Sequence, residues 1–418
     1  MGEVKTQKAT LIDKRYLIPF ILIASLFFLW GFSRSILDVL NKHFQDAMDM
    51  SKTESALIQV AVYTAYFLMA LPAGLFIVKK GYRSGVVLGL LLFAVGAFMF
   101  IPGEAAGSFE LFLAALFVLG CGLAFLETAA NPYAATLGDP RTSASRLNLA
   151  QSLNGMGCIF GPLIFGQILF NNEASASADG GSQLAIPYSV LGVIVLVAAV
   201  IFTRVKLPEI KNEESDKDEA SASGKAAIKK LWSQKLFVFG LAAIFCYEIA
   251  EIAINSFFIN YVTDDGTISN DTASTMLAFG GLGLFFTGRL IGSRVMSRIR
   301  AEKVLLFCGC CTVLCTLIVV LAGGGMLGIV ALCACYLFES IMFPTIFALS
   351  LNGLGNLTKL GSSFLMMSPI GGAIGTLTMG YVADSAGMSL SFLVPMAGYG
   401  VVLLFAMFYV SRKSVENR

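Results

Sequence analysis

The stretch LFLAALFVLGCGLAFLETAANPY, residues 111–133, decides the fold. Residues 111–126 carry no charge, and Glu127 follows directly at the end of this apolar run. A helix that spans a membrane needs about 20 mostly apolar residues, so the length is typical of a membrane segment. An ionisable group inside the membrane is costly and is a candidate functional group by default. We therefore expect Glu127 to have a role within the membrane.

The whole chain has the composition of a protein with many membrane spans. Of its 418 residues, 56% are hydrophobic and 13% are charged, and the mean hydropathy is +0.78. Soluble domains contain about 25% charged residues, so the composition excludes a soluble enzyme. The net charge of +2 gives no sign of nucleic-acid binding. The nine cysteines lie within apolar runs, and we expect neither disulfides nor a metal site or other cofactor.

Twelve apolar segments reach the length of a membrane span. Runs of this length are helices, because a helix satisfies its own backbone in lipid. The first segment has full span length, so we expect it to remain as a helix and not to be cleaved as a signal peptide. The sequence predicts an all-α membrane protein with spans at residues 16–40, 53–78, 85–102, 109–137, 146–170, 186–204, 235–262, 271–296, 303–323, 326–350, 362–382 and 388–411.

The lysines and arginines of the short loops predict the orientation. They gather in the N-terminal tail, in loops 2–3 and 8–9 and in the C-terminal tail, whereas the loops of the opposite side carry almost none. Lys42 and Lys52 are the exceptions. Cytoplasmic loops are the ones rich in Lys and Arg, so we expect both termini to be cytoplasmic. The protein is then a multi-pass membrane protein.

The two halves of the chain resemble each other. Pairs of matching residues lie 212 to 214 positions apart: Asp38 with Glu251, Gly74 with Gly288, Glu127 and Pro132 with Glu339 and Pro344, and three glycines of 157–166 with three of 371–380. A charged stretch at 205–234 separates the halves and is typical of a linker. We predict two six-helix bundles at 1–204 and 235–418, the plan of the major facilitator transporters, in which the substrate lies between the bundles.

Polar side chains form stripes on several predicted spans. Because lipid does not accept such faces, we expect them to point inward and to line one wet cavity. The stripes consist of Trp30, Arg34, Asp38 and Asn41; Gln59, Tyr63 and Tyr66; Glu127 and Asn131; Asn148, Gln151 and Asn154; Glu248, Glu251 and Asn255; and Glu339. Carboxylates and amides bind hydroxyl groups, and aromatic rings pack on the apolar side of a sugar ring. The stripes therefore favour a polyhydroxyl solute as the ligand.

Glu127 is the predicted proton site. Burial disfavours the charged form of a carboxyl group, so that a proton can bind and leave near neutral pH. If the substrate stabilises one protonation state, proton and substrate binding are linked. Arg34 and Asp38 are four residues apart and can pair within the helix. We therefore expect Asp38 to stay ionised as a ligand or coupling partner.

Several segments resemble the fucose permease family, the bacterial fucose/glucose/galactose–proton symporters. They are FLWGFSRSILDVLNKHFQ (28–45), SALIQVAVYTAYF (55–67), LETAANPYAATLG (126–138), RLNLAQSLNGMG (146–157) and FPTIFALSLNGLG (343–355). The resemblance implies that Asp38 and Glu127 are the two key acids and that Gln151 and Asn154 face the sugar. It also implies that the basic residues of KKGYRSG (79–85) latch the gate that faces the cytoplasm.

The predicted function is import of a monosaccharide with a proton by alternating access, by a chain that works as a monomer. The predicted substrate ligands are Trp30, Arg34, Asp38, Gln59, Tyr63, Gln151, Asn154, Glu251 and Asn255, and the predicted gate residues are Lys79, Lys80, Arg83, Gly288 and Arg289. For Arg289, the alternative to a gating role is a purely structural role.

Arg34, Glu339 and Glu251 leave the substrate open. Family members usually have a neutral residue in place of Arg34, and often Asn or Met in place of Glu339. Arg34 suits the carboxylate of an acidic sugar such as a uronate or sialic acid, and the extra acids suit sodium or an amino sugar. The alternative is therefore a symporter for an acidic or N-acetylated sugar, with sodium in place of the proton. An intramembrane enzyme or a sensor has little support, because a catalytic set and a signalling domain are both lacking.

Overall fold

The computed structural model describes residues 16–137, 143–170, 184–205, 225–296 and 298–416. The predicted N-terminal tail, most of the linker at 205–234 and the loop after the fifth predicted span lie outside these residues. In the described part, helices form nearly all of the regular structure.

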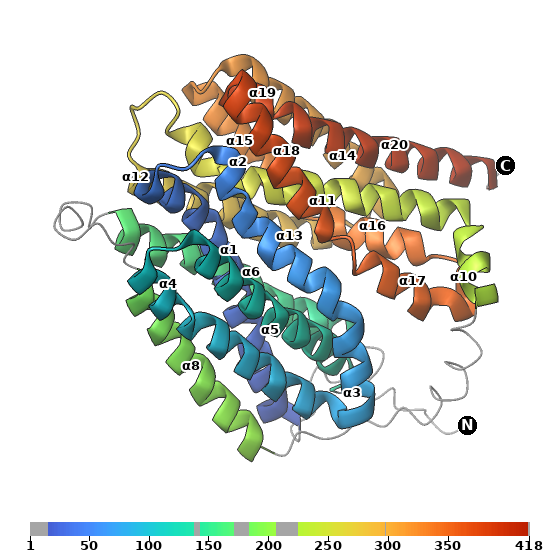
Figure 1. The fold of residues 1–418 in the computed structure, drawn as a ribbon. Helices are drawn as coiled ribbons and strands as arrows, with labels where there is room; N and C mark the ends of the chain where they lie inside the picture. Colours follow the sequence, from blue (N-terminus) through green and yellow to red (C-terminus); the bar gives the residue numbers. More distant parts are fainter. Residues whose placement is uncertain (1–15, 138–142, 171–183, 206–224, 297, 417–418) are drawn as a thin grey trace.

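The first half of the chain contains five long helices and two short ones. They are α1 (Leu17–Met48), α2 (Lys52–Ser55), α3 (Leu57–Phe98), α4 (Phe100–Ala106), α5 (Phe109–Thr136), α6 (Ser143–Phe170) and α8 (Ala185–Arg204). Figure 1 shows these helices, blue to green, packed side by side in one part of the molecule.

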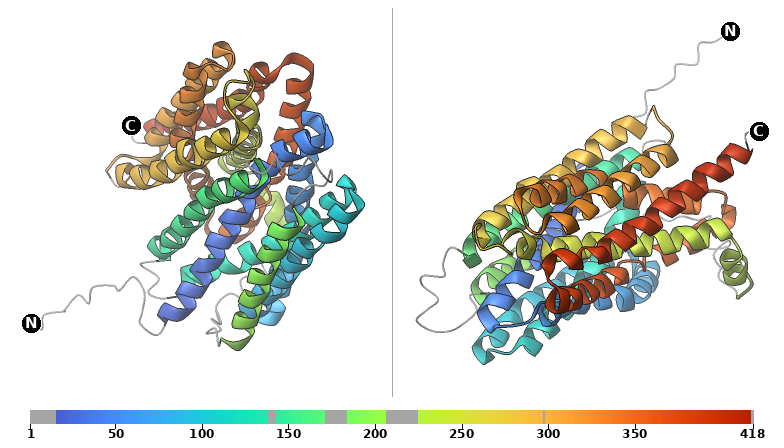
Figure 2. Two further views of the ribbon diagram at one scale, coloured as in Figure 1. Left: turned by 90° about the vertical axis from the view of Figure 1, so that its left-hand side faces the viewer. Right: turned by 90° about the horizontal axis from the view of Figure 1, so that it is seen from above.

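The second half forms the other part of the molecule, yellow to red in Figures 1 and 2. Its elements are α10 (Lys225–Trp232), α11 (Lys235–Val262), α12 (Asn270–Met276), the π-helix η3 (Leu277–Leu282), α13 (Gly283–Met296), α14 (Ala301–Ala322), α15 (Met326–Glu339), α16 (Met342–Leu351), the 3-10 helix η4 (Gly355–Leu357), α17 (Thr358–Leu365), α18 (Ile370–Ala386), α19 (Met388–Ser391) and α20 (Leu393–Glu416). The exact domain limits at 1–204 and 235–418 stay a prediction.

The outer surface of the helices is apolar, as a membrane requires. Ile186, Val190, Val193 and Val197 of α8 expose between 53% and 77% of their surface. Their spacing of three or four residues places them on one face of the helix. Large exposed apolar faces on a soluble protein would promote association, whereas in a bilayer they contact lipid at no cost.

The predicted helical membrane fold is confirmed, with one difference in detail. Among the described residues, eleven helical segments are long and apolar enough to cross a membrane. The predicted spans 53–78 and 85–102 are both present, because α3 consists of two helices separated at Gly81, whose non-helical φ of 81° suits a residue without a Cβ. The predicted span 362–382 is interrupted before Pro369, because proline disfavours a helical residue before it. Its main part, α18, has 17 residues and completes a set of twelve passes.

Both described ends of the chain lie at the same end of the molecule, which we call the terminal end. The last turns of α1 and α11 meet each other, since Asn41 Nδ2 donates to the carbonyl oxygen of Ser256 at 2.6 Å. The opposite end, which we call the loop end, carries residues 49–51, 263–269 and 387, where these helices and α18 finish.

Glycines allow the helices of each half to pack closely, as the repeat predicts. A Cβ on Gly157 of α6 would meet the backbone of Phe28 in α1, and one on Gly371 of α18 would meet the backbone of Phe245 in α11. The next glycines along these helices repeat the contact: Gly161 meets Phe32, and Gly375 meets Ile249. The same small-residue packing therefore occurs in both halves.

The packing corrects the sequence alignment of the two halves. The glycines keep their offset of 214 positions, but the residues they contact in α1 and α11 are offset by 217. This is about one helical turn more than the offset between Asp38 and Glu251. The counterpart of Arg34 is therefore Glu251, and the counterpart of Asp38 is Asn255.

Candidate functional site

Arg34 lies where the two halves meet near the middle of α1. Its Nε donates to the hydroxyl of Tyr63 in α3 at 3.1 Å, and its NH2 pairs with Oε2 of Glu251 in α11 at 3.6 Å. The ion pair therefore joins equivalent positions of the two halves. The Arg34 side chain keeps 30% of its surface accessible, so space remains beside it although its helix is packed on several sides.

The expected ion pair between Arg34 and Asp38 is not formed. Among the ion pairs of the described residues, the partner of Arg34 is Glu251. Asp38 is buried and accepts a hydrogen bond from Nε2 of Gln59 in α3 at 3.3 Å. The four-residue spacing brings Arg34 within electrostatic reach of Asp38, but Glu251 and Tyr63 draw the guanidinium to the neighbouring helices.

The remaining aromatic residues of the site lie on the same side of α1. Trp30 Nε1 donates to the hydroxyl of Tyr66 at 2.8 Å, and the rings of Tyr63 and Tyr66 are 6.1 Å apart. Trp30, Tyr63 and Tyr66 thus form an aromatic wall, with two of its polar atoms fixed by hydrogen bonds. Such rigid rings suit the apolar face of a ring-shaped ligand.

Glu127 of α5 belongs to the same cluster and is half-buried. Its hydrogen-bond partner is Asn131, one turn further along α5, and it is within electrostatic reach of Arg34 and Tyr66. Asn131 in turn accepts a hydrogen bond from Gln151 of α6 at 3.3 Å. Glu127 therefore has no cation bound to it directly among the described residues, unlike Glu251.

Asn154 and Asn255 lie at the two flanks of the cluster. Asn154 of α6 donates through Nδ2 to the carbonyl oxygen of Phe27 in α1 at 3.2 Å, so part of its amide is engaged in packing. Asn255 of α11 is buried, and its Oδ1 has no hydrogen-bond partner among the described residues. The same holds for Oε1 of Gln59 and Oε2 of Glu248.

These unpaired oxygens indicate what the site can bind. A buried acceptor without a partner is unfavourable, so three of them in one region suit a ligand that donates several hydrogen bonds. Hydroxyl groups do so. The predicted ligands Trp30, Arg34, Asp38, Gln59, Tyr63 and Glu251 are gathered around this region, whereas Gln151 and Asn154 reach it through their partners in α5 and α1.

The predicted gate residues lie apart from this cluster and make local contacts. Arg83 donates to the carbonyl oxygens of Phe202, at 3.0 Å, and Thr203, at the end of α8. It thus caps that helix, as a cation near a helix C-terminus does favourably. Lys79 and Lys80 are exposed at the terminal end.

Gly288 and Arg289 support a break in the tenth span. Pro344 has no N–H, so the carbonyl of Ser340 lacks its helical partner. Arg289 Nε donates to this carbonyl at 3.2 Å, and Gly288 allows α13 to approach Leu337 and Ser340 closely. These contacts fit the structural alternative for Arg289, and a gating role stays a prediction.

Hydrogen bonds that the sequence did not predict join the two halves at the loop end. Asp384 of α18 accepts from the backbone N–H groups of Lys52 and Thr53, at 3.0 and 2.8 Å. Asn270 of α12 donates to Asp46 of α1 at 2.8 Å. Further bonds join Asn260 with Gln45 and Ser274 with the carbonyl of Pro162. Apart from the Arg34 pair, the hydrogen bonds between the halves in the described residues all lie at this end.

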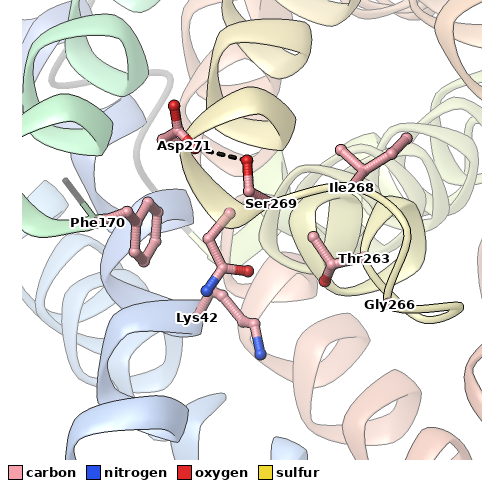
Figure 3. Close-up of a pocket in the computed structure, with 8 residues that line it drawn as sticks. Lys42, Phe170, Thr263, Gly266, Ile268, Ser269 and Asp271 are labelled. Carbon is pink, nitrogen blue, oxygen red and sulfur yellow. Dashed lines mark hydrogen bonds between the residues drawn. The ribbon is translucent and has the colours of Figure 1, made fainter. Parts of the chain in front are cut away.

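A pocket of about 340 Å³ lies at the same end, above the joined helices. Figure 3 shows Lys42 of α1 and Phe170 of α6 on one side and residues 263–271 on the other. Ser269 donates to Asp271 within its wall at 2.6 Å. This pocket is separate from the Arg34 cluster.

No group of three or more metal-ligating side chains occurs among the described residues. The nine cysteines are free. The site's chemistry therefore comes from carboxyl, amide, hydroxyl and aromatic groups together with one guanidinium.

The chain is similar to known transporters over nearly its whole length. The Major Facilitator Superfamily model matches residues 23–359. A glucose/galactose transporter of Brucella abortus biovar 1 (strain 9-941) is 36% identical over 403 residues, covering 94% of this chain and 95% of the relative. The L-fucose-proton symporter of Escherichia coli (strain K12) is 35% identical over 435 residues, covering 97% of each chain.

Solved structures agree with this similarity. The crystal structure of FucP, a major facilitator transporter in the outward conformation, has a TM-score of 0.71 and 35% identity, covering 95% of this chain and 99% of the other. The xylose transporter XylE of E. coli, in a partially occluded inward-open conformation, has a TM-score of 0.71 at 10% identity, which shows the fold alone. The chain therefore belongs to the major facilitator superfamily and, within it, to the family of fucose permeases and glucose/galactose transporters.

Proposed function

We propose that this protein is a secondary transporter that imports a neutral monosaccharide together with a proton. The observation that carries the proposal is the inter-half cluster around Arg34, which combines an ion pair between the halves, an aromatic wall and buried acceptors without a hydrogen-bond partner among the described residues. The names of the relatives, a glucose/galactose transporter and an L-fucose-proton symporter, agree with a sugar of this kind.

The charges of the cluster favour a neutral sugar over an acidic one. Asp38, Glu127, Glu248 and Glu251 all lie within electrostatic reach of Arg34. Glu251 already pairs with the guanidinium, so an incoming carboxylate would displace one acid while facing three more. Like charges this close are unfavourable in a medium of low dielectric constant. A neutral N-acetylated sugar meets no such obstacle and is therefore included in the test.

Glu127 is the proposed proton site. It is half-buried and bonded to Asn131 without an ion pair, so its carboxyl group can exist with or without a proton at modest cost. A transmembrane potential supplies about 2.3 kcal/mol per charge per 100 mV to a proton that crosses with the sugar. Asp38, held by Gln59, is the proposed coupling partner that senses the sugar.

The proposed cycle opens the cluster to the two sides of the membrane in turn. The halves are bonded to each other at the loop end, which supports a conformation in which access is from the terminal end. Lys79, Lys80, Arg300 and Lys303 lie at the terminal end, and Lys42 and Lys52 at the other. We therefore propose that the terminal end faces the cytoplasm, in a bacterial inner membrane. One chain supplies both halves of the cluster, so we propose that a monomer suffices.

Uptake into proteoliposomes tests the function directly. L-fucose, D-galactose, D-glucose, N-acetylglucosamine and glucuronate are each offered with an imposed pH gradient, with an imposed sodium gradient, or with neither. We expect accumulation of at least one neutral sugar driven by the pH gradient alone. Accumulation that requires sodium, or that occurs only with glucuronate, would overturn the proposal.

A further inference from the structure

The short helix α10 lies at the point where a membrane span begins. It covers Lys225–Trp232, and the candidate span α11 starts at Lys235, after two intervening residues. Figure 1 and the right-hand view of Figure 2 show α10 turned across the end of α11. The helix therefore lies at the level of the membrane surface, where one face of a helix can contact protein and another can contact lipid headgroups.

One face of α10 holds the helix against the protein. Leu231 has no exposed surface, and Ala227, four residues earlier, packs against the same core. This spacing places the two side chains one above the other. The ring of Trp232 meets the edge of Phe364 in α17, with the ring centroids 5.9 Å apart. The orientation of the helix is thus set by packing, although it has only eight residues.

The exposed side of α10 combines apolar and basic groups. Ile228 and Trp232 expose 37% and 47% of their surface, and because they are four residues apart they form one apolar flank. Lys229, Lys230 and, at the start of α11, Lys235 are exposed as well. None of the three lysines forms an ion pair with another described residue. We call these five residues the α10 patch.

The combination of groups favours anionic phospholipid as the partner of the α10 patch. Tryptophan is enriched where helices meet the membrane surface, because its ring is apolar and its N–H group is polar. Lysine places its stem on apolar surface and its ammonium group in water, and basic groups near a membrane attract anionic lipids. The acidic stretch KNEESDKDEASASG (211–224) suits the charge of the lysines, but it has no large apolar residue to cover the indole.

We propose that the α10 patch binds the headgroups of anionic phospholipids at the membrane surface beside α11. The ammonium groups of Lys229, Lys230 and Lys235 contact the headgroup phosphates, while Ile228 and Trp232 contact the upper parts of the acyl chains. Each lysine close to the surface favours anionic lipid by about fivefold. This binding goes beyond the proposed function, because it requires neither a sugar nor a proton gradient.

The fluorescence of Trp232 tests the proposal, because the chain has only two tryptophans. In Trp30→Phe, Trp232 is the single emitter, and this variant is placed in nanodiscs of three parts phosphatidylcholine and one part phosphatidylglycerol. Brominated acyl chains, which quench tryptophan by contact, are carried by all of the phosphatidylglycerol in one sample and by the same molar amount of phosphatidylcholine in the other. The composition is otherwise identical, so a difference in quenching reports which lipid lies beside Trp232. We expect brominated phosphatidylglycerol to quench at least about twofold more strongly.

The lysines are tested by substitution in the same background. Lys229→Gln/Lys230→Gln should remove most of the excess quenching by phosphatidylglycerol, since the amides carry no charge. Lys79→Gln/Lys80→Gln is the matched control and should keep the excess, because these two lysines are also adjacent and exposed at the terminal end but belong to α3. A high salt concentration should lower the excess by screening the charges.

The outcomes decide between lipid and the acidic linker. Equal quenching by the two brominated lipids, or an excess that survives Lys229→Gln/Lys230→Gln, would exclude the proposed binding. An excess that appears only after the acids of residues 213–219 are replaced by their amides would assign the lysines to the linker. Comparison of Trp232→Phe with the unmodified protein gives the same quenching as a difference, so the test does not depend on the folding of Trp30→Phe. No sugar is present, so the result is independent of the proposed function.

Discussion

Replacing Asp384 by alanine removes the largest group of hydrogen bonds between the two halves. Its carboxylate accepts from the N–H groups of Lys52 and Thr53 and from the Thr53 hydroxyl, at 3.0, 2.8 and 2.5 Å. These atoms belong to the start of α2 and the end of α18, so the bonds exist only while the loop end is closed. Asp384→Ala therefore favours the conformation that is open at the loop end.

The size of the shift follows from the exposure of these bonds. A buried hydrogen bond to a charged group contributes about 1.5–3 kcal/mol, but Asp384 is exposed and water replaces part of what is lost. We expect about 1–3 kcal/mol for the three bonds together, which corresponds to a change of about 5–150-fold in the conformational equilibrium. Asp384→Asn keeps one acceptor oxygen and should give an intermediate shift.

Hydrogen exchange measured by mass spectrometry on the protein in lipid nanodiscs reports this shift. Peptides that cover residues 49–56 and 263–276 should both exchange faster, because the second segment holds the separate bond between Asn270 and Asp46. Faster exchange in residues 49–56 alone would refute the reasoning, since it would mean a local contact and not a closure of the whole end.

Asp265→Asn is the matched control for an acid at the same end. Hydrogen bonds from the backbone and side chain of Thr267 lower the pKa of Asp265. Its contacts stay within its own loop, and the loop gains stability from them only above the pH at which the carboxyl group ionises. Asp265→Asn should leave exchange in residues 49–56 unchanged.

Two further substitutions test the packing and the charges of the fold. Gly375→Val places a side chain against the backbone of Ile249 and should lower the stability by about 1–3 kcal/mol or more, measured as a lower melting temperature in detergent. Gly400→Ala is the control, because nothing lies near Gly400, and it should leave the melting temperature unchanged. Equal melting temperatures of the two variants would contradict the packing argument. Arg34→Gln leaves Glu251 buried without its ion pair, which should lower the free energy of unfolding by about 3–5 kcal/mol if the carboxyl group stays ionised. The double variant Arg34→Gln/Glu251→Gln should recover part of the lost melting temperature. No recovery would mean that the two residues are not coupled.

The sequence was sufficient to predict the helical membrane fold and the inward direction of the polar stripes, because both follow from the cost of polar groups in lipid. It did not predict the partner of Arg34. A spacing of four residues makes a pair with Asp38 sterically feasible, but Glu251 belongs to another helix, and only the packing of α1 against α11 brings it within 3.6 Å.

The sequence likewise did not predict the contacts between segments that lie far apart along the chain. Nothing in the composition around Asp384 distinguishes an acid that binds the start of α2 from one that faces water. The interruption before α18 could have been found, since Pro369 restricts the residue before it. The offset between α1 and α11 could not have been found from the sequence. The glycines that face these helices keep an offset of 214 positions, whereas the residues that they contact are offset by 217.

Glu127→Gln in proteoliposomes tests the central claim most directly. The amide mimics the protonated carboxyl group, so sugar should still exchange across the membrane at equal pH. The account predicts that this variant loses one proton per sugar, and that its accumulation ratio therefore falls about tenfold below that of the unmodified protein for each pH unit of gradient. Accumulation equal to that of the unmodified protein at every gradient would contradict it.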